Sequence, residues 1–256
     1  MPRKRARSKP TKQRKLESRQ SGVQRPRLSR ILIATGCIFI VWLVYDLASL
    51  PNGSEFKTRA PDRSALMTER INAALLRGSK YKLEYEYRTR REMAPELARA
   101  VLLAEDAAFF DHTGFDWHEI GVAIEDSLLT DKRTRGASTI TQQLARNLYL
   151  GDSRSLLRKL REAVITYKIE HSLSKSRILE LYLNIVEWGP GIFGAQAAAK
   201  YHFGVSANKL TANQAATLAA ILPNPLTLYN PKSSPARVAR RREMILNRIK
   251  KSRVVF

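Results

Sequence analysis

Cysteine, histidine and acidic residues are all scarce in this sequence. Cys37 is the single cysteine among 256 residues, and there are four histidines. One cysteine excludes an intrachain disulfide framework and any zinc or iron–sulfur site built from several cysteines. Stability must therefore come from packing, and a chain of this length with 44% hydrophobic residues can build the core of one or two domains.

The shortage of acidic residues leaves a large positive charge. Only 23 Asp and Glu residues oppose 45 Lys and Arg residues, which gives a net charge of +22. Such an excess indicates an anionic partner: nucleic acid, an acidic membrane surface or a phosphorylated substrate. Composition alone does not choose among these three classes.

Half of the positive charge lies in the first thirty residues. Residues 1–30 contain twelve Lys and Arg residues and one acidic residue, Glu17, so this tail carries +11. The tail also contains three prolines and almost no aliphatic side chains, so it cannot bury enough apolar surface to offset the entropy of ordering. We expect residues 1–30 to form a disordered basic tail.

An apolar run follows the tail directly. Residues 31–50, ILIATGCIFIVWLVYDLASL, contain one charged residue, Asp46. As a helix this run is roughly 30 Å long, the thickness of the hydrocarbon core of a bilayer. A secretory signal peptide would have a shorter apolar region and a small-residue cleavage site, and a core helix would have a polar face. The run is predicted to be a retained transmembrane helix.

The basic tail predicts the orientation of this helix. Segments rich in Lys and Arg beside a membrane span stay in the cytoplasm, so the N-terminus should be cytoplasmic and residues 51–256 should lie outside the membrane. This single-pass topology argues against nucleic acid as a partner of the folded part.

Beyond the apolar run the pattern becomes mainly helical. Residues 51–91 are predicted to be a polar linker with a short helix around 64–76 and an edge strand over 82–90. A mainly α-helical domain is expected over residues 92–232, followed by a basic C-terminal helix over 233–256. The individual helices are predicted over 93–110, 117–129, 139–150, 156–171, 175–186 and 211–222.

Three short motifs match known site patterns without their required context. Residues 189–194 match GxGxxG, but no βαβ unit surrounds them, so a turn is predicted. His118-Glu119 begins like HExxH, yet Val122 occupies the position of the second histidine. Two SxxK matches, at 172–175 and 206–209, have no KTG motif after them. We interpret all of these as chance matches.

Glu105 is the first candidate for chemistry. It lies in the apolar stretch 93–110, where a structural protein has little reason to bury an acid. If the helix continues, Glu105, Phe109 and His112 share one face, and a carboxylate there can act as a general base between aromatic walls that limit water. The alternative is a structural acid that caps a helix or forms a salt bridge.

The segment 135–147 combines hydroxyl groups, amides and a cation at a predicted helix start. Ser138 or Thr139 can cap this helix, with Gln142 placed as in a capping box. Free N–H groups at a helix start also bind phosphates, and Arg146 would add positive charge.

A second cationic stretch follows in the next predicted helix. Arg154, Arg158 and Arg161 fall at positions i, i+4 and i+7, Glu162 lies one turn after Arg158, and Lys168 comes further on. A solvated, ion-paired helix face is the alternative interpretation of this stretch.

In this order and spacing, these segments resemble the peptidoglycan glycosyltransferase family, glycosyltransferase family 51, and in particular its stand-alone members, the monofunctional transglycosylases. The resemblance covers residues 90–232. One departure is Arg146, where many relatives have Lys. The motifs that carry the resemblance are Glu105-Asp106-xx-Phe109-xx-His112-x-Gly114-x-Asp116, Gly136-x-Ser138-Thr-Ile-Thr-Gln142-Gln143-xx-Arg146-Asn147, Arg158-Lys159-xx-Glu162, Lys175-xx-Ile178-Leu-Glu180-x-Tyr182-Leu183-Asn184 and Ala219-Ala-Ile-Leu-Pro223-Asn224-Pro225.

The resemblance implies a peptidoglycan polymerase with a lysozyme-like helical fold at the outer face of the bacterial cytoplasmic (inner) membrane. Its substrates would be lipid II and the nascent glycan chain, and membrane lipids and other cell wall synthesis proteins are expected partners. Glu105 would be the general base, and Glu162 would be a second catalytic acid that positions cations or a divalent metal such as Mg²⁺. No other cofactor and no protein ligand set for a metal are implied. The expected substrate-binding residues are Ser138, Gln142, Gln143, Arg146, Asn147, Arg154, Arg158, Arg161 and Lys168.

The resemblance also implies one membrane contact, and the charge of the C-terminal stretch suggests a second as one of two interpretations. An apolar region would dip into the bilayer, and the segment 123–132 fits this description. The stretch 237–253 carries eight basic residues and either lies on anionic lipid or is the end of a soluble amphipathic helix.

Two other classes of protein remain as alternatives. A lytic muramidase would share the helical fold and a catalytic Glu but would not need the cationic residues. A membrane-tethered basic scaffold without catalysis would need neither Glu105 nor Glu162.

Overall fold

The computed structural model describes residues 25–129, 136–153 and 155–252. The chain divides into two units, residues 1–48 and residues 49–256. Of the predicted disordered tail, residues 1–24 therefore lie outside the described residues.

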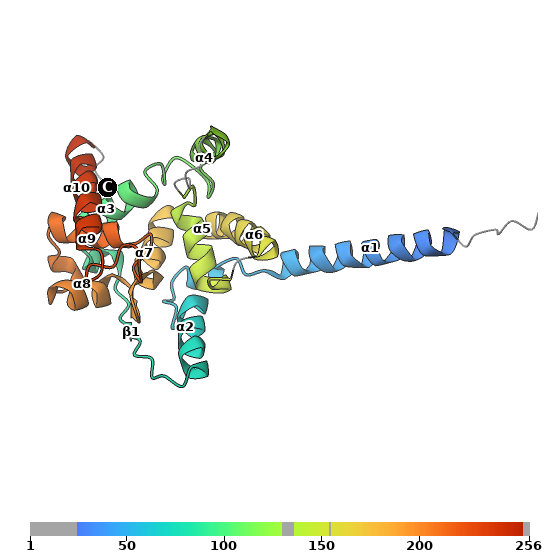
Figure 1. The fold of residues 1–256 in the computed structure, drawn as a ribbon, viewed down its shortest axis with the longest axis horizontal. Helices are drawn as coiled ribbons and strands as arrows, with labels where there is room; N and C mark the ends of the chain where they lie inside the picture. Colours follow the sequence, from blue (N-terminus) through green and yellow to red (C-terminus); the bar gives the residue numbers. More distant parts are fainter. Residues whose placement is uncertain (1–24, 130–135, 154, 253–256) are drawn as a thin grey trace, which may run out of the picture. The chain divides into compact units, whose positions relative to one another are not determined.

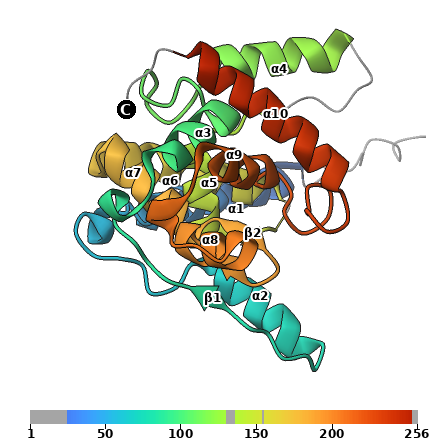
Figure 2. The same cartoon turned by 90° about the vertical axis from the view of Figure 1, so that its left-hand side faces the viewer.

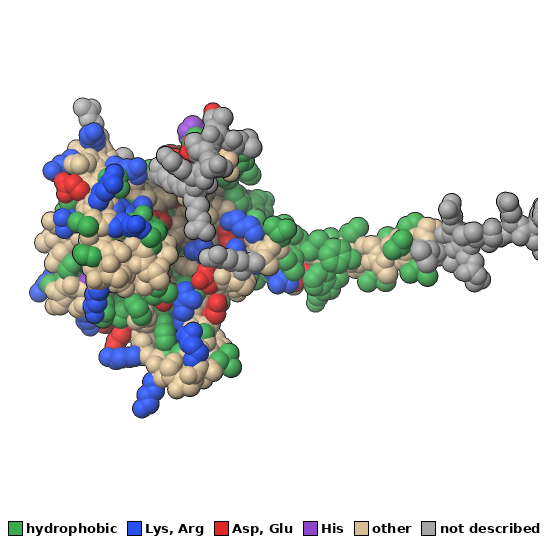
Figure 3. Space-filling model, viewed as in Figure 1, with side chains coloured by type: hydrophobic (Ala, Val, Ile, Leu, Met, Phe, Trp, Pro, Cys, Tyr) green, Lys and Arg blue, Asp and Glu red, His purple; other side chains and the backbone are tan. Residues whose placement is uncertain are grey.

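The first unit contains one long apolar helix. Helix α1 spans Arg25–Ser49, and from Ser29 onward it is long and apolar enough to cross a membrane. Its hydrophobic side chains are exposed along most of its length, as Figure 3 shows. The helix begins six residues before the predicted start at Ile31. Pro26 does not interrupt it, because this proline lies in the first turn, where backbone N–H groups have no partner within the helix. An N-terminal helix of this kind is consistent with membrane anchoring.

The second unit is mainly helical, which confirms the predicted fold class (Figure 1). A π-helical turn, η3 (Arg146–Leu150), continues α5, and three short 3₁₀ helices occur at η1 (Ser54–Phe56), η2 (Arg90–Glu92) and η4 (Ala207–Lys209). The α-helices of this unit are α2 (Ala65–Leu76), α3 (Pro95–Glu105), α4 (Trp117–Leu129), α5 (Ile140–Ala145), α6 (Leu156–Ser172), α7 (Lys175–Ile185), α8 (Ala195–Phe203), α9 (Ala212–Ile221) and α10 (Pro235–Lys251).

Local sequence explains where most of these helices begin. A serine or threonine precedes them, and its side chain accepts a hydrogen bond from a backbone N–H of the first turn, which has no partner within the helix. This arrangement caps α2, α5, α6, α7 and α9 through Ser64, Thr139, Ser155, Ser174 and Thr211.

The core lies between two groups of helices. Helix α3 packs against α9 and α10, and α5 packs against α6 and α7 (Figures 1 and 2). Leu97 and Val101 of α3, Ile178 of α7 and Leu218 of α9 are fully buried. Leu97 and Val101 lie one turn apart on the buried face of α3, whereas the second halves of α7 and α9 are buried almost all round.

A small sheet lies beside the helices. Strand β1 (Glu84–Tyr85) pairs in parallel with β3 (Ile192–Phe193), and β3 pairs antiparallel with β2 (Glu187–Gly189). The predicted edge strand is present, although it is shorter than residues 82–90. The GxGxxG match contains the turn at residues 190–191, as predicted, together with the end of β2 and all of β3.

Gly194 follows β3 in a conformation that only glycine adopts easily. Its φ is +82°, and a Cβ atom here would lie 2.4 Å from the backbone oxygen of Asn184. We expect Gly194→Ala to lower the free energy of unfolding by roughly 3 kcal/mol or more, because backbone strain and a steric clash act together. Gly204→Ala is the matched control: φ is +68° but no heavy atom lies within 4 Å, so a loss of about 1 kcal/mol is expected. Thermal unfolding measures both variants. Equal losses in the free energy of unfolding would show that the clash with Asn184 does not matter.

The segment after the apolar helix is bound to the domain rather than loose. Lys168 of α6 donates to the Leu50 carbonyl (2.7 Å), and Arg177 of α7 donates to the Phe56 carbonyl (2.7 Å). The Tyr149 hydroxyl donates to Glu55 (2.6 Å), and burial, followed by this hydrogen bond, raises the pKa of Tyr149 far above its ordinary value. Part of the predicted linker is therefore held on α6 and α7.

The basic C-terminal helix packs on the domain with its apolar face. Val238 and Ile245 of α10 are buried, and α10 lies against α3 and α9 (Figure 2). Arg99 of α3 donates to the Ser252 carbonyl (2.7 Å) just after α10 ends. Helix α10 is thus an amphipathic helix whose inner face belongs to the core.

Candidate active site

Helix α3 ends at Glu105 because the next residue, Asp106, is held from two sides. Asp106 is buried; its Oδ2 accepts a hydrogen bond from the Ile140 backbone N–H (2.9 Å), and its Oδ1 lies 2.9 Å from His112 Nε2. The Gly114 N–H donates to His112 Nδ1 (3.1 Å), so Nε2 carries the proton toward Asp106. Asp106 thereby connects the end of α3 to the start of α5.

This termination corrects one prediction. Glu105, Phe109 and His112 do not share a helix face, because residues after Glu105 form turns rather than helix. His112 faces Asp106, and Phe109 is fully buried in the core. The physical reason is the capture of Asp106 by the N–H of a residue 34 positions away, which no local pattern shows.

The start of α5 is capped as the sequence predicts. Thr139 is the N-cap residue, and Gln142 completes a capping box by accepting from the Thr139 N–H (3.0 Å). The Thr139 hydroxyl also donates to the Gly114 carbonyl (2.7 Å). Gly114 has φ +96°, and a Cβ atom there would lie 2.9 Å from a methyl group of Thr166. The loop 106–114 is therefore held against the start of α5 and against α6.

Glu105 is held through both carboxylate oxygens. Its Oε2 accepts from Gln143 Nε2 (3.1 Å), and its Oε1 accepts from a terminal nitrogen of Arg241 (3.0 Å). The Glu105 side chain is 10% exposed. Sequence reasoning did not identify Arg241 as a site residue. Its spacing from the buried Val238 and Ile245, three and four residues away, is the signal that places it on the inner face of α10.

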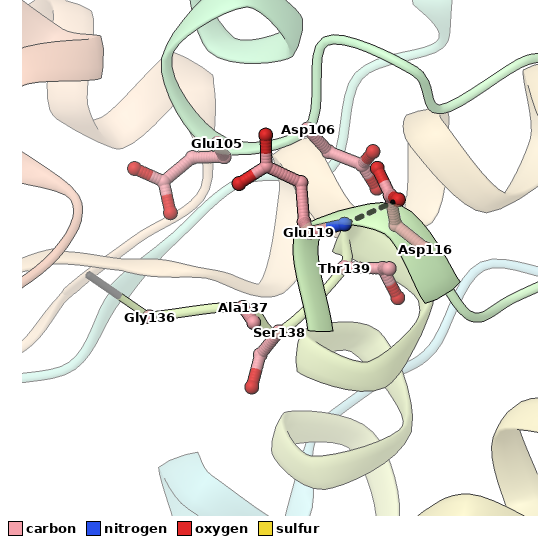
Figure 4. Close-up of a pocket in the computed structure, with 8 residues that line it drawn as sticks. All are labelled: Glu105, Asp106, Asp116, Glu119, Gly136, Ala137, Ser138 and Thr139. Atoms are coloured by element: carbon pink, nitrogen blue, oxygen red, sulfur yellow. Dashed lines mark hydrogen bonds between the residues drawn. The ribbon is translucent and has the colours of Figure 1, made fainter. Parts of the chain in front are cut away.

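A polar pocket opens beside Glu105. Figure 4 shows side chains from three segments around it: the end of α3, the start of α4 and the loop before α5. Ser138, a predicted substrate-binding residue, contributes to this pocket, whereas Asp116 and Glu119 were not predicted to line it. The residues that line it are Glu105, Asp106, Asp116, Glu119, Gly136, Ala137, Ser138 and Thr139.

Arg146 lies where α5 passes into the π-helical turn. Its Nε donates to Asn147 Oδ1 (3.4 Å), and Asn147 is buried. Burial raises the pKa of Tyr182 well above its ordinary value, the charge of Glu105 raises it further, and the charge of Arg146 lowers it. The charges of Arg146 and Glu105 therefore act on the same buried hydroxyl with opposite sign.

Glu162 occupies a separate polar cluster in α6. It is buried and forms ion pairs with Arg158 and Lys159. Among the described residues, neither Glu162 nor Arg158 lines the pocket beside Glu105. Arg161 is half-buried on the same helix, and Arg154 lies outside the described residues.

Several of the predicted site residues fall into three groups. Glu105, Gln143 and Ser138 meet at the pocket, because Gln143 Nε2 also lies 3.4 Å from the Ser138 carbonyl. Glu162 and its two cations form the second group. Lys168 is the third, in the second half of α6, where it binds the Leu50 carbonyl.

An apolar helix able to cross a membrane precedes a helical domain in which a carboxylate is held between an amide and an arginine at a polar pocket, an arrangement consistent with a membrane-anchored enzyme. Residues 72–250 match the family model described as transglycosylase, and the chain belongs to this family. The resemblance seen in the motifs is thereby confirmed.

Curated relatives agree with this assignment. A protein from Bordetella avium (strain 197N) is 45% identical over 226 residues, covering 87% of this chain and 92% of the relative. Proteins from Azoarcus sp. (strain BH72) and Chromobacterium violaceum are 43% and 39% identical, covering 77% and 87% of this chain and 84% and 97% of the relatives. All three are named biosynthetic peptidoglycan transglycosylase.

Proposed function

We propose that this protein is a glycosyltransferase that polymerises lipid II into peptidoglycan strands for the bacterial cell wall. The observation that carries the proposal is the family match over residues 72–250, together with relatives of that name that align over most of their length. Lipid II and the nascent glycan chain are then the substrates. A pyrophosphate-linked substrate also accounts for a positively charged domain.

Glu105 is the general base of the proposed reaction. It removes the proton from the 4-hydroxyl of the acceptor GlcNAc as that oxygen attacks the anomeric carbon of the lipid-linked donor. The new O4–C1 bond forms as the bond from C1 to the pyrophosphate oxygen breaks, and the configuration inverts from α to β. The position of Glu105 at a polar pocket, with both oxygens accepting hydrogen bonds, supports this role because such bonds favour the ionised form.

Cationic and polar residues stabilise the departing pyrophosphate in this proposal. Ser138 lines the pocket, Gln143 binds Glu105, and Arg161 and Lys168 lie on α6. Each charge-assisted hydrogen bond to the leaving group is stronger than a neutral one. The full proposed set is Ser138, Gln142, Gln143, Arg146, Asn147, Arg154, Arg158, Arg161 and Lys168.

Glu162 acts in this proposal by positioning cations. Arg158 and Lys159 each hold one of its carboxylate oxygens, so this carboxylate already has cationic partners. This arrangement does not fit a divalent ion bound at Glu162. The described residues also contain no group of three or more His, Cys, Asp or Glu side chains placed to hold a metal ion.

The proposed location is the bacterial cytoplasmic membrane, with the N-terminus in the cytoplasm and the catalytic domain outside. The apolar helix and the basic residues that precede it support this orientation. Exposed apolar side chains on α4, including Trp117 and Ile124, support a second contact of the domain with the bilayer. Residues 130–132 of the segment predicted to make this contact lie outside the described residues.

Polymerisation of labelled lipid II by the purified full-length protein in detergent micelles tests the proposed function. We expect lipid II to be consumed and long glycan strands to appear, and we expect moenomycin to block both changes. Cleavage of preformed glycan without consumption of lipid II would instead identify a lytic muramidase. Absence of both activities would favour a non-catalytic scaffold.

A further inference from the structure

A chain of two hydrogen bonds connects the core of the domain to Glu105. The Tyr182 hydroxyl of α7 donates to Gln143 Oε1 (3.0 Å), and Gln143 Nε2 donates to Glu105 Oε2 (3.1 Å). Tyr182 is fully buried and packs within the hydrophobic core. The amide of Gln143 therefore lies between a rigid buried hydroxyl and the carboxylate.

We propose that Tyr182 is a positioning residue for the reaction: it orients the Gln143 amide so that its NH₂ group, and not its oxygen, faces Glu105. This inference rests on the proposed role of Glu105 as general base. It adds a residue from α7, which belongs to none of the three groups of predicted site residues.

The orientation matters because the two ends of an amide have nearly the same shape and opposite hydrogen-bonding character. The NH₂ end stabilises a carboxylate, whereas the oxygen end repels it. Among the described residues, Gln143 is the one hydrogen-bond partner of the Tyr182 hydroxyl, so a flipped amide would leave a buried hydroxyl proton without an acceptor. The Ser138 carbonyl, 3.4 Å from Gln143 Nε2, favours the same orientation from the other side.

Tyr182 remains a donor across the working pH range. Burial raises its pKa well above the ordinary value, and the negative charges of Glu105 and Asp106 raise it further, against the opposing charges of Arg146 and Arg241. The hydroxyl therefore keeps its proton at acidic and neutral pH.

Several other charges surround Glu105 and would be unchanged by a substitution at Tyr182. Arg241 approaches from α10, and Arg146 acts from the end of α5. Asp106 is the next residue in the chain, and Asp116 and Glu119 line the same pocket from the start of α4. A change in pH dependence after loss of the Tyr182 hydroxyl therefore reports on the amide, because the surrounding charges stay in place.

Tyr182→Phe removes the hydroxyl and keeps the ring. We expect kcat/KM for lipid II polymerisation to fall by about tenfold, because the base loses its fixed orientation. We also expect the acidic limb of the kcat/KM profile to move to higher pH by about one unit, because a carboxylate without its NH₂ donor is protonated more readily. A purely structural role for Tyr182 would not move this limb.

Tyr85→Phe is the matched control. The Tyr85 hydroxyl donates to the Pro61 carbonyl (2.7 Å) away from the site, and burial raises the pKa of Tyr85 to about 12. This variant loses one hydroxyl hydrogen bond and should keep the wild-type pH profile. Gln143→Leu keeps Tyr182 and removes the amide, so it should show the same shift as Tyr182→Phe, and the double variant should show no additional shift. Gln143→Leu also tests the proposal if Tyr182→Phe does not fold.

The outcomes separate this inference from the role of Glu105. If Glu105→Gln is inactive while Tyr182→Phe and Gln143→Leu both keep the wild-type acidic limb, the positioning role is overturned and the base assignment stands. If Glu105→Gln polymerises lipid II at the wild-type rate, the base assignment itself is overturned. A shift shared by Tyr182→Phe and Gln143→Leu but absent from Tyr85→Phe supports the proposal.

Discussion

Replacing Glu105 with Gln is expected to lower the rate of lipid II polymerisation by about 10²–10⁴-fold. The amide has almost the same shape as the carboxylate but cannot accept a proton from the attacking hydroxyl. Arg241 and Gln143 now donate to different oxygens of Glu105, so only one of these two donors would keep an oxygen acceptor in the variant. Single-turnover measurement with saturating labelled lipid II separates this loss from a change in substrate binding.

Glu243→Gln is the control for this prediction. Glu243 is an exposed carboxylate on α10, two residues from Arg241, so its replacement changes the net charge by the same amount outside the pocket. We expect polymerisation at the wild-type rate. Equal rates for Glu105→Gln and the wild-type protein would show that another group removes the proton.

Asp106→Ala is expected to have the largest effect on stability among the residues of the site. It leaves the buried Ile140 N–H without its acceptor and removes the partner of His112. The expected loss is about 3 kcal/mol in the free energy of unfolding, because buried groups left without partners cost the full penalty of desolvation. For a domain of this size the melting temperature should fall by roughly 6–12 °C.

Thermal unfolding monitored by circular dichroism measures this change. Asp111→Ala serves as the control because Asp111 is an exposed aspartate in the same loop, and its melting temperature should match that of the wild-type protein. We also expect Asp106→Ala to lose polymerisation activity below its melting temperature, since the end of α3 and the start of α5 would no longer be joined. A stable and fully active Asp106→Ala variant would contradict this structural role.

These two predictions concern adjacent residues with different tasks. Asp106 turns inward and holds the start of α5, and Glu105 lies at the pocket between Gln143 and Arg241. Two adjacent residues therefore have different tasks: Glu105 is the proposed base, and Asp106 makes the contact with Ile140 that fixes the end of α3. The resemblance to the family implied a catalytic role for Glu105 and placed Asp106 in the same motif, but it implied no task for Asp106.

The positive charge of the chain likewise has several separate uses. The basic residues before the apolar helix support its orientation in the membrane. Within the domain, Arg241 binds Glu105, Arg158 binds Glu162 and Lys168 binds the Leu50 carbonyl. Part of the charge predicted to face a pyrophosphate is therefore paired inside the protein.

The sequence by itself determined the features that depend on local patterns. It predicted the apolar helix, most helix boundaries, the capping box formed by Thr139 and Gln142, and the family to which the chain belongs. These follow from side-chain periodicity, from the hydrogen-bonding needs of helix ends and from motif spacing, all of which operate over a few residues.

Only the tertiary structure decided which groups meet at Glu105. Arg241 lies 136 residues away in the sequence, and the Tyr182–Gln143 bond joins residues 39 positions apart. The same holds for the end of α3. The helical pattern in the sequence predicts a helix up to Phe110, but the helix ends at Glu105, where Asp106 binds the Ile140 N–H. Such contacts form when packed helices bring side chains together, and no short-range pattern in the sequence encodes them.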